Sequence, residues 1–354
     1  MKNQKYITGI QQIGIGVSDP DKAFDWYRKN MGMDIKVFDE KITDNIKLPY
    51  TEGKPVEKRA ILTFNLQSGG GIEIWRHSGR PPKAECKEAS LGDIGIYIAK
   101  MKTIDIDFTY NSFKQKGIKL ISEIVLTPAG IKEFYMADPY GNIFQYVEER
   151  EYFANTNFHA GGVYGAVIGV SDIDKSLVVY QNILEYDTIV YDKTGIFGDF
   201  KNLEGGDSQF RRVLLKHSKP RTGSFSPMFG PTEIELIQNI DHKGKKLYDR
   251  NVWGDKGFIH LCFDVIGIKE LNKEVIFNGF PITVDSADSF DLGKAEGHFV
   301  YISDPDDIPL EFVETHKLPV IKTLGWYINI KNRNPEKSLP DWMIKMMSLK
   351  RVKK

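Results

Sequence analysis

The 354-residue chain has few cysteines and no excess of charge of either sign. Two cysteines, Cys86 and Cys262, cannot form a disulfide scaffold in so long a chain, so a reducing compartment is expected. Lys and Arg total 48, as do Asp and Glu, and this neutrality argues against nucleic-acid binding and electrostatic membrane attachment. No apolar run is long enough for a transmembrane helix, and the first residues do not resemble a signal peptide. We therefore predict a compact cytoplasmic protein without nucleic-acid or membrane partners.

The sequence consists of two similar halves. The segment GVSD at 16–19 recurs at 169–172, and the identities continue in register at Tyr27 and Tyr180. An Asp-Pro dipeptide stands near the end of each half. Because a fixed offset of this kind marks an internal repeat, we predict two domains and a tail. Their expected ranges are 1–151, 159–316 and 317–354.

Each half contains the same short unit twice. A β-rich stretch such as QIGIGV at 12–17 is followed by a helix, which Asp19 caps and Pro20 begins, and then by about three strands. The short connections between these strands favour antiparallel pairing, so the predicted class is α+β. A unit with one apolar sheet face must pair with another unit to bury that face. The sequence therefore predicts four βαβββ modules, joined in pairs into two sheets.

This module, opened by QIGIGVSD and closed by DPYGNIFQ or DPDDIPLE, resembles the vicinal oxygen chelate superfamily. That superfamily includes glyoxalase I, methylmalonyl-CoA epimerase, extradiol dioxygenases and bleomycin-resistance proteins. The resemblance covers about residues 8–316 and is strongest at 12–19, 137–145, 257–265 and 303–311. It implies that two modules form one curved sheet. It also implies that four side chains, from the first and last strand of each module, bind a divalent metal in the concavity.

The resemblance assigns two positions to each module: Gln12 and Glu73, Asp93 and Gln145, Gly165 and Glu235, His260 and Glu311. If the first module pairs with the fourth, the metal ligands are Gln12, Glu73, His260 and Glu311, the types found in glyoxalase I-like sites. The other set, Asp93, Gln145, Gly165 and Glu235, is then expected to bind metal poorly or not at all. An alternative is a three-ligand site in the second half alone, formed by Glu235, His260 and Glu311.

The predicted ligands suit Zn, Ni, Co, Mn or Fe, with Zn the first expectation. Two open positions on the metal would take adjacent oxygens of a small-molecule substrate. The expected function is that of a metal-dependent isomerase or epimerase. It would act on a small α-hydroxy ketone or related polar compound through an enediolate, with Glu311, or alternatively Glu73, moving the proton. The alternatives are an extradiol-type dioxygenase, a lyase or glutathione-dependent glyoxalase, and a non-enzymatic binding protein of the resistance type.

Two segments outside the modules are also of interest. The tail is apolar enough at 324–327 and 340–347 to form an ordered arm and a short helix. These would pack on the body or on a second subunit of a homodimer. Such an extension resembles the cyclitol epimerases of the same superfamily, which act on valiolone-type ketones. The connection at 220–231, rich in Pro and Gly, is either a lid beside the site or a long hairpin loop.

Overall fold

The computed structural model describes residues 4–83, 89–248, 253–287, 290–292, 295–321, 326–331 and 333–352. Cys86 lies outside these ranges, and Cys262 is a buried free thiol. The first module contains β1 (Tyr6–Gly16), α1 (Pro20–Met31), β2 (Ile35–Asp44), the 3₁₀-helix Leu48–Tyr50, β3 (Val56–Phe64) and β4 (Gly71–His77). The second contains β5 (Gly95–Thr103), α2 (Ile106–Gln115), β6 (Lys119–Leu120), β7 (Val125–Leu126), β8 (Lys132–Ala137) and β9 (Ile143–Glu148).

The second half repeats this order. The third module contains β10 (Ala160–Gly169), α3 (Ile173–Leu177), the π-helix Val178–Ile183, β11 (Thr188–Gly195), the 3₁₀-helix Gly198–Phe200, β12 (Phe210–Lys216), α4 (Ser226–Phe229) and β13 (Glu233–Asn239). The fourth contains β14 (Gly257–Ile266), α5 (Ile268–Phe277), β15 (Ile282–Asp285), β16 (Phe290–Leu292), β17 (Ala295–Ser303) and β18 (Pro309–Ile321). The tail adds β19 (Trp326–Asn329), α6 (Asp341–Lys345) and the 3₁₀-helix Met346–Lys350.

The start of α1 illustrates how local sequence sets these elements. Asp19 has an extended backbone and accepts a hydrogen bond from the backbone N–H of Lys22 at 3.1 Å, while Pro20 is the first helical residue. This is the expected N-cap arrangement. Gly32 ends the helix with a φ of 71°, a left-handed conformation that suits glycine. The third module begins in the same way, because Asp172 caps α3.

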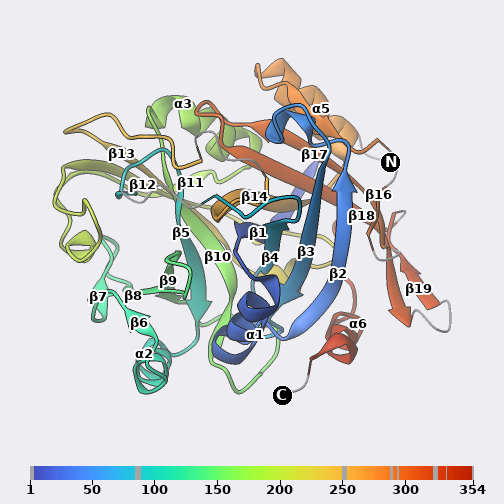
Figure 1. Cartoon of the computed structure of the whole chain (residues 1–354), viewed down its shortest axis with the longest axis horizontal. Helices are drawn as coiled ribbons and strands as arrows, with labels where there is room; N and C mark the ends of the chain where they lie inside the picture. The colour runs from blue at the N-terminus through green and yellow to red at the C-terminus, as the bar shows by residue number, and fades with distance from the viewer. Residues whose placement is uncertain are drawn as a thin grey trace.

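Two sheets combine the modules crosswise (Figure 1). The first sheet has the order β15-β17-β18-β14-β1-β4-β3-β2, with β16 paired to β17 and β19 to β18. The second has the order β11-β12-β13-β10-β5-β9-β8-β6, with β7 paired to β8. Strands β1 and β14 are antiparallel neighbours at the centre of the first sheet, and β10 and β5 at the centre of the second. Module one therefore pairs with module four, and the α+β class with four modules is confirmed.

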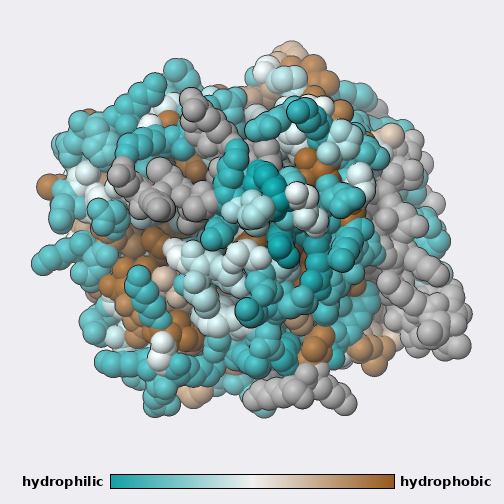
Figure 2. All heavy atoms as spheres, viewed as in Figure 1, coloured by the Kyte–Doolittle hydropathy of each residue, from teal (hydrophilic) through white to brown (hydrophobic). Residues whose placement is uncertain are grey.

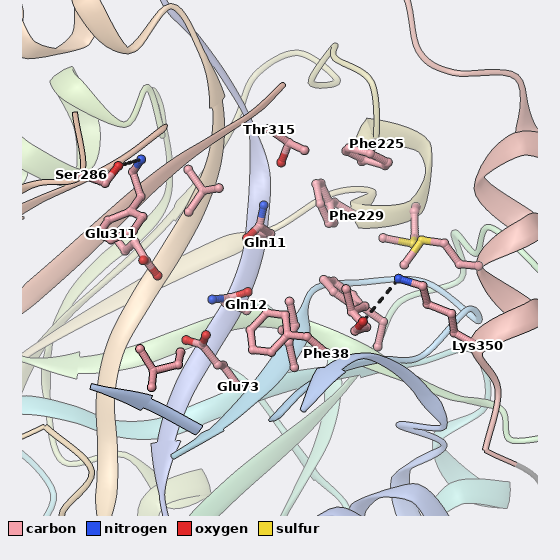
Figure 3. A pocket seen from close by; sticks show the side chains of 18 of the residues that line it. Gln11, Gln12, Phe38, Glu73, Phe225, Phe229, Ser286, Glu311, Thr315 and Lys350 are labelled. Carbon is pink, nitrogen blue, oxygen red and sulfur yellow. Dashed lines mark hydrogen bonds between the residues drawn. The ribbon is translucent and has the colours of Figure 1, made fainter. Parts of the chain in front are cut away.

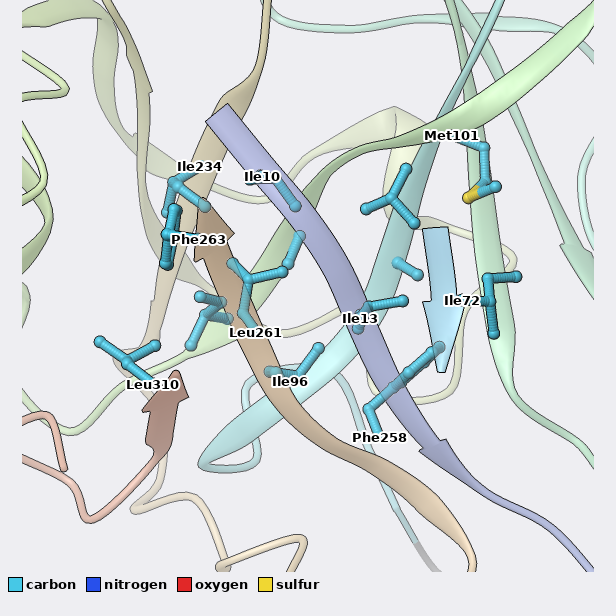
Figure 4. Close-up of a cluster of buried hydrophobic side chains, with 14 of the residues drawn as sticks. Ile10, Ile13, Ile72, Ile96, Met101, Ile234, Phe258, Leu261, Phe263 and Leu310 are labelled. Atoms are coloured by element: carbon cyan, nitrogen blue, oxygen red, sulfur yellow. The ribbon is translucent and has the colours of Figure 1, made fainter. Parts of the chain in front are cut away.

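The core lies between the two sheets (Figure 4). Side chains from both contribute to one cluster of fully buried apolar residues, among them Ile13, Ile72, Ile168, Leu261 and Leu310. Because successive side chains of a strand point to opposite faces, the neighbours of these residues in sequence point away from the core. The surface seen in Figure 2 is mainly hydrophilic, with small separate apolar groups. Among the described helices, none is sufficiently long and apolar to cross a lipid bilayer.

Candidate metal centre

Four central strands of the first sheet bring the predicted ligands to one place. Gln12 lies on β1, Glu73 on β4, His260 on β14 and Glu311 on β18, each one residue from a core side chain. Alternation along the strands therefore turns all four away from the core. Glu73, His260 and Glu311 offer ligand atoms that lie within 4.8 Å of one another. His260 Nε2 is 3.0 Å from Glu311 Oε2 and 3.4 Å from Glu73 Oε2.

A glycine on β1 makes room for the histidine. Gly14 is paired with His260 on one side and with Glu73 on the other. A Cβ atom at this position would lie 2.2 Å from both Cε1 and Nδ1 of His260. The imidazole thus lies directly against the backbone of β1, and this cradle holds it beside both carboxylates. Glycine inside a strand commonly marks such a close approach.

Gln12 faces the same cavity as the two glutamates. The register of β1 shifts between Ile10 and Gln12, an irregularity of the β-bulge type, and both Gln11 and Gln12 line the cavity. Figure 3 shows Gln12 beside Glu73, with Glu311 at the same end of the cavity. The Gln12 Oε1 atom is buried and has no hydrogen-bond partner among the described residues.

The polar atoms of this group fit a bound cation. Gln12 Oε1 is buried without a hydrogen-bond partner within the described part of the chain, and the buried His260 Nε2 and Glu311 Oε2 atoms face one another at 3.0 Å. Buried polar atoms normally have partners, and several unpaired ones facing one another need an explanation. Two carboxylates, an imidazole and an amide oxygen are donors that divalent first-row metals accept. The residues present therefore fit the metal that the sequence predicted.

Aromatic side chains fix the orientation of these predicted ligands. The Trp75 indole N–H donates a hydrogen bond of 2.8 Å to Glu73 Oε2. The Trp253 ring stacks on His260 at a centroid distance of 4.8 Å and an interplanar angle of 24°. Tyr301 meets the same imidazole edge-on at 5.9 Å. Three of the predicted ligands, the two glutamates and the histidine, are therefore buried among aromatic rings, where their charged groups interact strongly with one another.

Mutual attraction sets the charge states of this group. Burial alone lowers the pKa of His260, but the adjacent carboxylates of Glu311 and Glu73 outweigh it, so the pKa is raised. Burial raises the pKa of Glu311, but His260 and the more distant Lys47 act oppositely, and the pKa is lowered overall. Glu311 is accordingly ionised at neutral pH, the form in which it can bind a cation or accept a proton.

Two lysines stand close to the carboxylates. The Lys47 ammonium lies 4.6–5.2 Å from the ring centroids of Trp75, Trp253, Phe299 and Tyr301. Lys58 is fully buried and forms an ion pair with Asp44. Burial, reinforced by Lys47, lowers the pKa of Lys58 to about 7, and Asp44 partly opposes the shift. The aromatic rings and Asp44 thus hold two cationic side chains beside the site.

The second sheet differs at the equivalent positions. Three of the four predicted positions are confirmed by strand register: Gly165 matches Gln12, Glu235 matches Glu73, and Gln145 matches Glu311. The prediction for Asp93 is wrong. The residue that matches His260 is Ile98, paired with Val167 as His260 is with Gly14. Asp93 precedes β5, and its carboxylate accepts hydrogen bonds from the backbone N–H groups of Ser90 and Lys245. The match of Ile94-Gly95-Ile96 to the QIGI segment at 12–15 misplaced the register of β5.

Cationic side chains take the place of a metal in the second sheet. Lys100 Nζ lies 2.6 Å from Glu233 Oε1 and 2.7 Å from Glu235 Oε2, and all three side chains are buried. Arg212 also pairs with Glu235, donating from Nε at 2.7 Å. Burial raises the pKa of Glu235, but Arg212 and Lys100 reverse this and lower it to about 2. Because Glu235 lies in a different sheet from His260, the alternative three-ligand site is excluded.

The candidate metal centre opens into a cavity of about 430 Å³. Its polar end contains Gln12, Glu73 and Glu311 together with Asp44 and Lys47. The rest of its wall is mainly apolar and comes chiefly from β2, β3, the connection before β13 and the tail, with a smaller part from β17 and β18. Their lining residues are Val37, Phe38, Leu62, Phe64, Phe225, Met228, Phe229, Ile328, Leu339, Met343, Ile344, Met346 and Met347. The connection at 220–231 therefore lies beside the site.

Sequence reasoning had not identified several of these features. Gly14, Trp253 and Lys47 were not expected at the site, although a glycine at the centre of an apolar strand is a usable signal. The apolar wall was also unexpected, because its residues come chiefly from two strands of the first module, a loop of the third and the tail, which no single motif connects.

Residues 9–146 match the family model described as Glyoxalase/Bleomycin resistance protein/Dioxygenase superfamily. Among curated proteins, none matches the sequence significantly. Among solved structures, glyoxalase I from Zea mays is similar at 14% identity and a TM-score of 0.52, covering 88% of this chain and 92% of that one. A protein from Bacillus subtilis subsp. subtilis str. 168, described as a dioxygenase candidate, has 14% identity and a TM-score of 0.57, covering 88% and 86%. At these identities the structural likeness concerns the fold alone.

Proposed function

We propose an enzymatic function from the premise that the chain belongs to the glyoxalase/bleomycin resistance protein/dioxygenase superfamily. The proposed activity is that of a divalent-metal-dependent isomerase or epimerase, and its substrate is an α-hydroxy ketone or a related compound with adjacent oxygens. The observation that carries the proposal is the meeting of Glu73, His260 and Glu311 within 4.8 Å at one end of a cavity. Gln12 is the proposed fourth ligand, and Zn remains the first expectation.

A bound divalent metal would polarise the substrate carbonyl and acidify the neighbouring C–H group. The chain itself supplies the group that moves the proton. Trp75 donates a hydrogen bond to Glu73 and so restrains it, whereas Glu311 Oε2 lies 3.0 Å from His260 Nε2 and accepts no bond from an indole among the described residues. Glu311 is therefore the proposed base, ionised at neutral pH and able to swing between ligand and proton acceptor. Lys47 balances the negative charge that develops on the substrate.

The ligand types favour this reaction over an extradiol cleavage. Iron-dependent oxygenases of that kind use two histidines and one carboxylate, and His260 is the one histidine among the three grouped ligands. A binding protein that uses the cavity without metal is the other alternative. Its cavity would not need two buried carboxylates facing one imidazole.

The test is hydrogen–deuterium exchange in D₂O. A panel of α-hydroxy ketones is incubated with purified protein, and NMR records deuterium at the carbon beside the carbonyl. We expect exchange with metal-loaded protein and none after metal removal. The Glu311→Gln variant, which keeps the shape of the side chain, should lose exchange by at least about 100-fold. Oxygen consumption with ring cleavage would instead indicate a dioxygenase. Protein purified with less than about a tenth of an equivalent of metal that refuses added metal would indicate a binder.

A further inference from the structure

The end of the cavity away from the ligands is an apolar chamber that no βαβββ module supplies alone. Its floor is the outer part of β2 and β3, one wall is the connection that contains α4, and the other is the tail around α6. Figure 3 shows Phe225, Phe229 and Lys350 on the opposite side of the view from Glu73 and Glu311, with Phe38 between. The chamber and the ligand group thus share one continuous space.

The α4 wall is firmly held. The Met228 carbonyl accepts hydrogen bonds from the Gly69 backbone N–H at 2.7 Å and from the Ser68 hydroxyl at 3.0 Å. Phe229 packs so closely on β1 that a Cβ added at Gly9 would lie 2.9 Å from the Cβ of Phe229. The wall is therefore formed before any ligand arrives, which lowers the entropic cost of binding.

The tail wall is fixed at both of its ends. The Leu339 backbone N–H donates to the Ser224 carbonyl at 3.0 Å, and that of Val352 donates to the Asp34 carbonyl at 2.9 Å. The Arg351 guanidinium also pairs with Asp34 at 3.0 Å. Between these anchors, α6 and the following turn face the chamber with apolar side chains. Four of the nine methionines of the chain line the chamber: Met228, Met343, Met346 and Met347.

We propose that this chamber binds an extended apolar group of the substrate while its adjacent oxygens lie at the metal ligands. The inference rests on the proposed function for the polar end of the substrate, and it adds the chemical class of the rest of the substrate. A substrate that was polar throughout would leave the apolar wall facing water, whereas an apolar chain or ring would displace that water. Methionine side chains adapt to varied apolar shapes, so the wall suits a flexible chain. Residues of the tail, 339–347, then determine substrate specificity.

A series of 2-hydroxy-n-alkanoates, from lactate to 2-hydroxydecanoate, tests the proposal. Each member has the same pair of adjacent oxygens and differs only in the length of its alkyl chain. Calorimetry with Zn²⁺-loaded protein should show affinity rising by up to about fourfold per added methylene, the factor for full burial. The rise should stop once the chamber is full. Affinity that does not depend on chain length would overturn the proposal.

Two variants locate the binding of the alkyl chain. Met347→Trp narrows the chamber and should move the plateau to shorter chains. Leu349→Trp adds the same ring two residues later at a side chain that is 66% exposed, and should leave the series unchanged. Equal plateaus in both variants, with both proteins folded by circular dichroism, would place the alkyl chain elsewhere and refute the proposal. The wild-type series decides the matter if either variant does not fold.

The same series in metal-free protein separates this inference from the proposed function. The dependence on chain length should persist without metal, at lower overall affinity, because the alkyl chain contacts only side chains. If metal changes no affinity but longer chains still bind better, the proposed function fails and the chamber stands. If metal raises every affinity equally and chain length has no effect, the chamber proposal fails and the proposed function stands.

Discussion

Replacing Gly14 by alanine should displace His260 from the candidate metal centre although no predicted ligand is itself substituted. The added Cβ would lie 2.2 Å from Cε1 and Nδ1 of the imidazole, and 3.1 Å from Nε2. Ordinary carbon contacts need about 3.5–4.0 Å, so the ring must move by more than about 1 Å. The backbone of Gly14 is not left-handed and itself accepts alanine. The steric effect therefore falls on the histidine.

Metal affinity is the quantity to measure. Displacing one of four ligands should weaken Zn²⁺ binding by at least about 100-fold, as judged by competition with a chromogenic chelator. Overpacking in the buried site should also lower the free energy of unfolding by about 1–3 kcal/mol. Gly195→Ala is a matched control, because its Cβ would meet no atom within 4 Å. It should bind metal like the wild type.

A double-mutant cycle identifies the cause of the loss. If Gly14→Ala acts through the imidazole, it should weaken metal binding little further in a His260→Ala background. Wild-type affinity in the single Gly14→Ala variant would refute the assignment of His260 as a ligand. Fully additive losses would show that the glycine acts through another part of the site.

Two further predictions concern other buried ionisable side chains. Lys100→Met removes one cationic partner of Glu233 and Glu235 in the second sheet. Chemical denaturation should therefore show a free energy of unfolding lower by about 3–5 kcal/mol, with Zn²⁺ affinity unchanged. The control Lys132→Met, at an exposed ion pair, should change the free energy of unfolding little. Burial and the charge of Arg221 lower the pKa of His217 to about 4, so the folded protein resists a proton that the unfolded chain accepts below about 6.5. Stability should therefore fall by up to about 3 kcal/mol as pH drops from about 6.5 to 4, and His217→Phe should reduce that slope in urea titrations. An unchanged slope would contradict the assignment to His217.

The crosswise pairing of modules followed from ligand chemistry in the sequence. Neither half has a complete set of four donors, and only the outer modules together supply an amide, an imidazole and two carboxylates. Glu311 was found by counting from the Asp304-Pro305 dipeptide because the turn between β17 and β18 has the same length as the turn between β8 and β9. Asp93 was chosen because Ile94-Gly95-Ile96 follows it, but the residue in register with the ligand positions is Ile98, seven residues before the helix cap Asp105.

The apolar chamber was beyond the reach of the same reasoning. Its residues come from strand ends, a loop and the tail, and the distances between them depend on how these segments fold over the sheet. The sequence did contain one unused signal in the second sheet. Lys100 interrupts an apolar strand, and a lysine at such a position must find anionic partners if it is buried. Those partners, Glu233 and Glu235, come from a different half of the chain.

The antiparallel pairing of β1 with β14 also governs how the protein is made. Gln12 meets Cys262 across this ladder, a separation of about 250 residues. A ribosome must therefore release most of the polypeptide before the opening strand finds its neighbour, and until then that strand presents unsatisfied amide groups to the cell. Such distant contacts slow folding. Newly synthesised chains should accordingly depend on chaperones more than those of a relative in which adjacent modules pair.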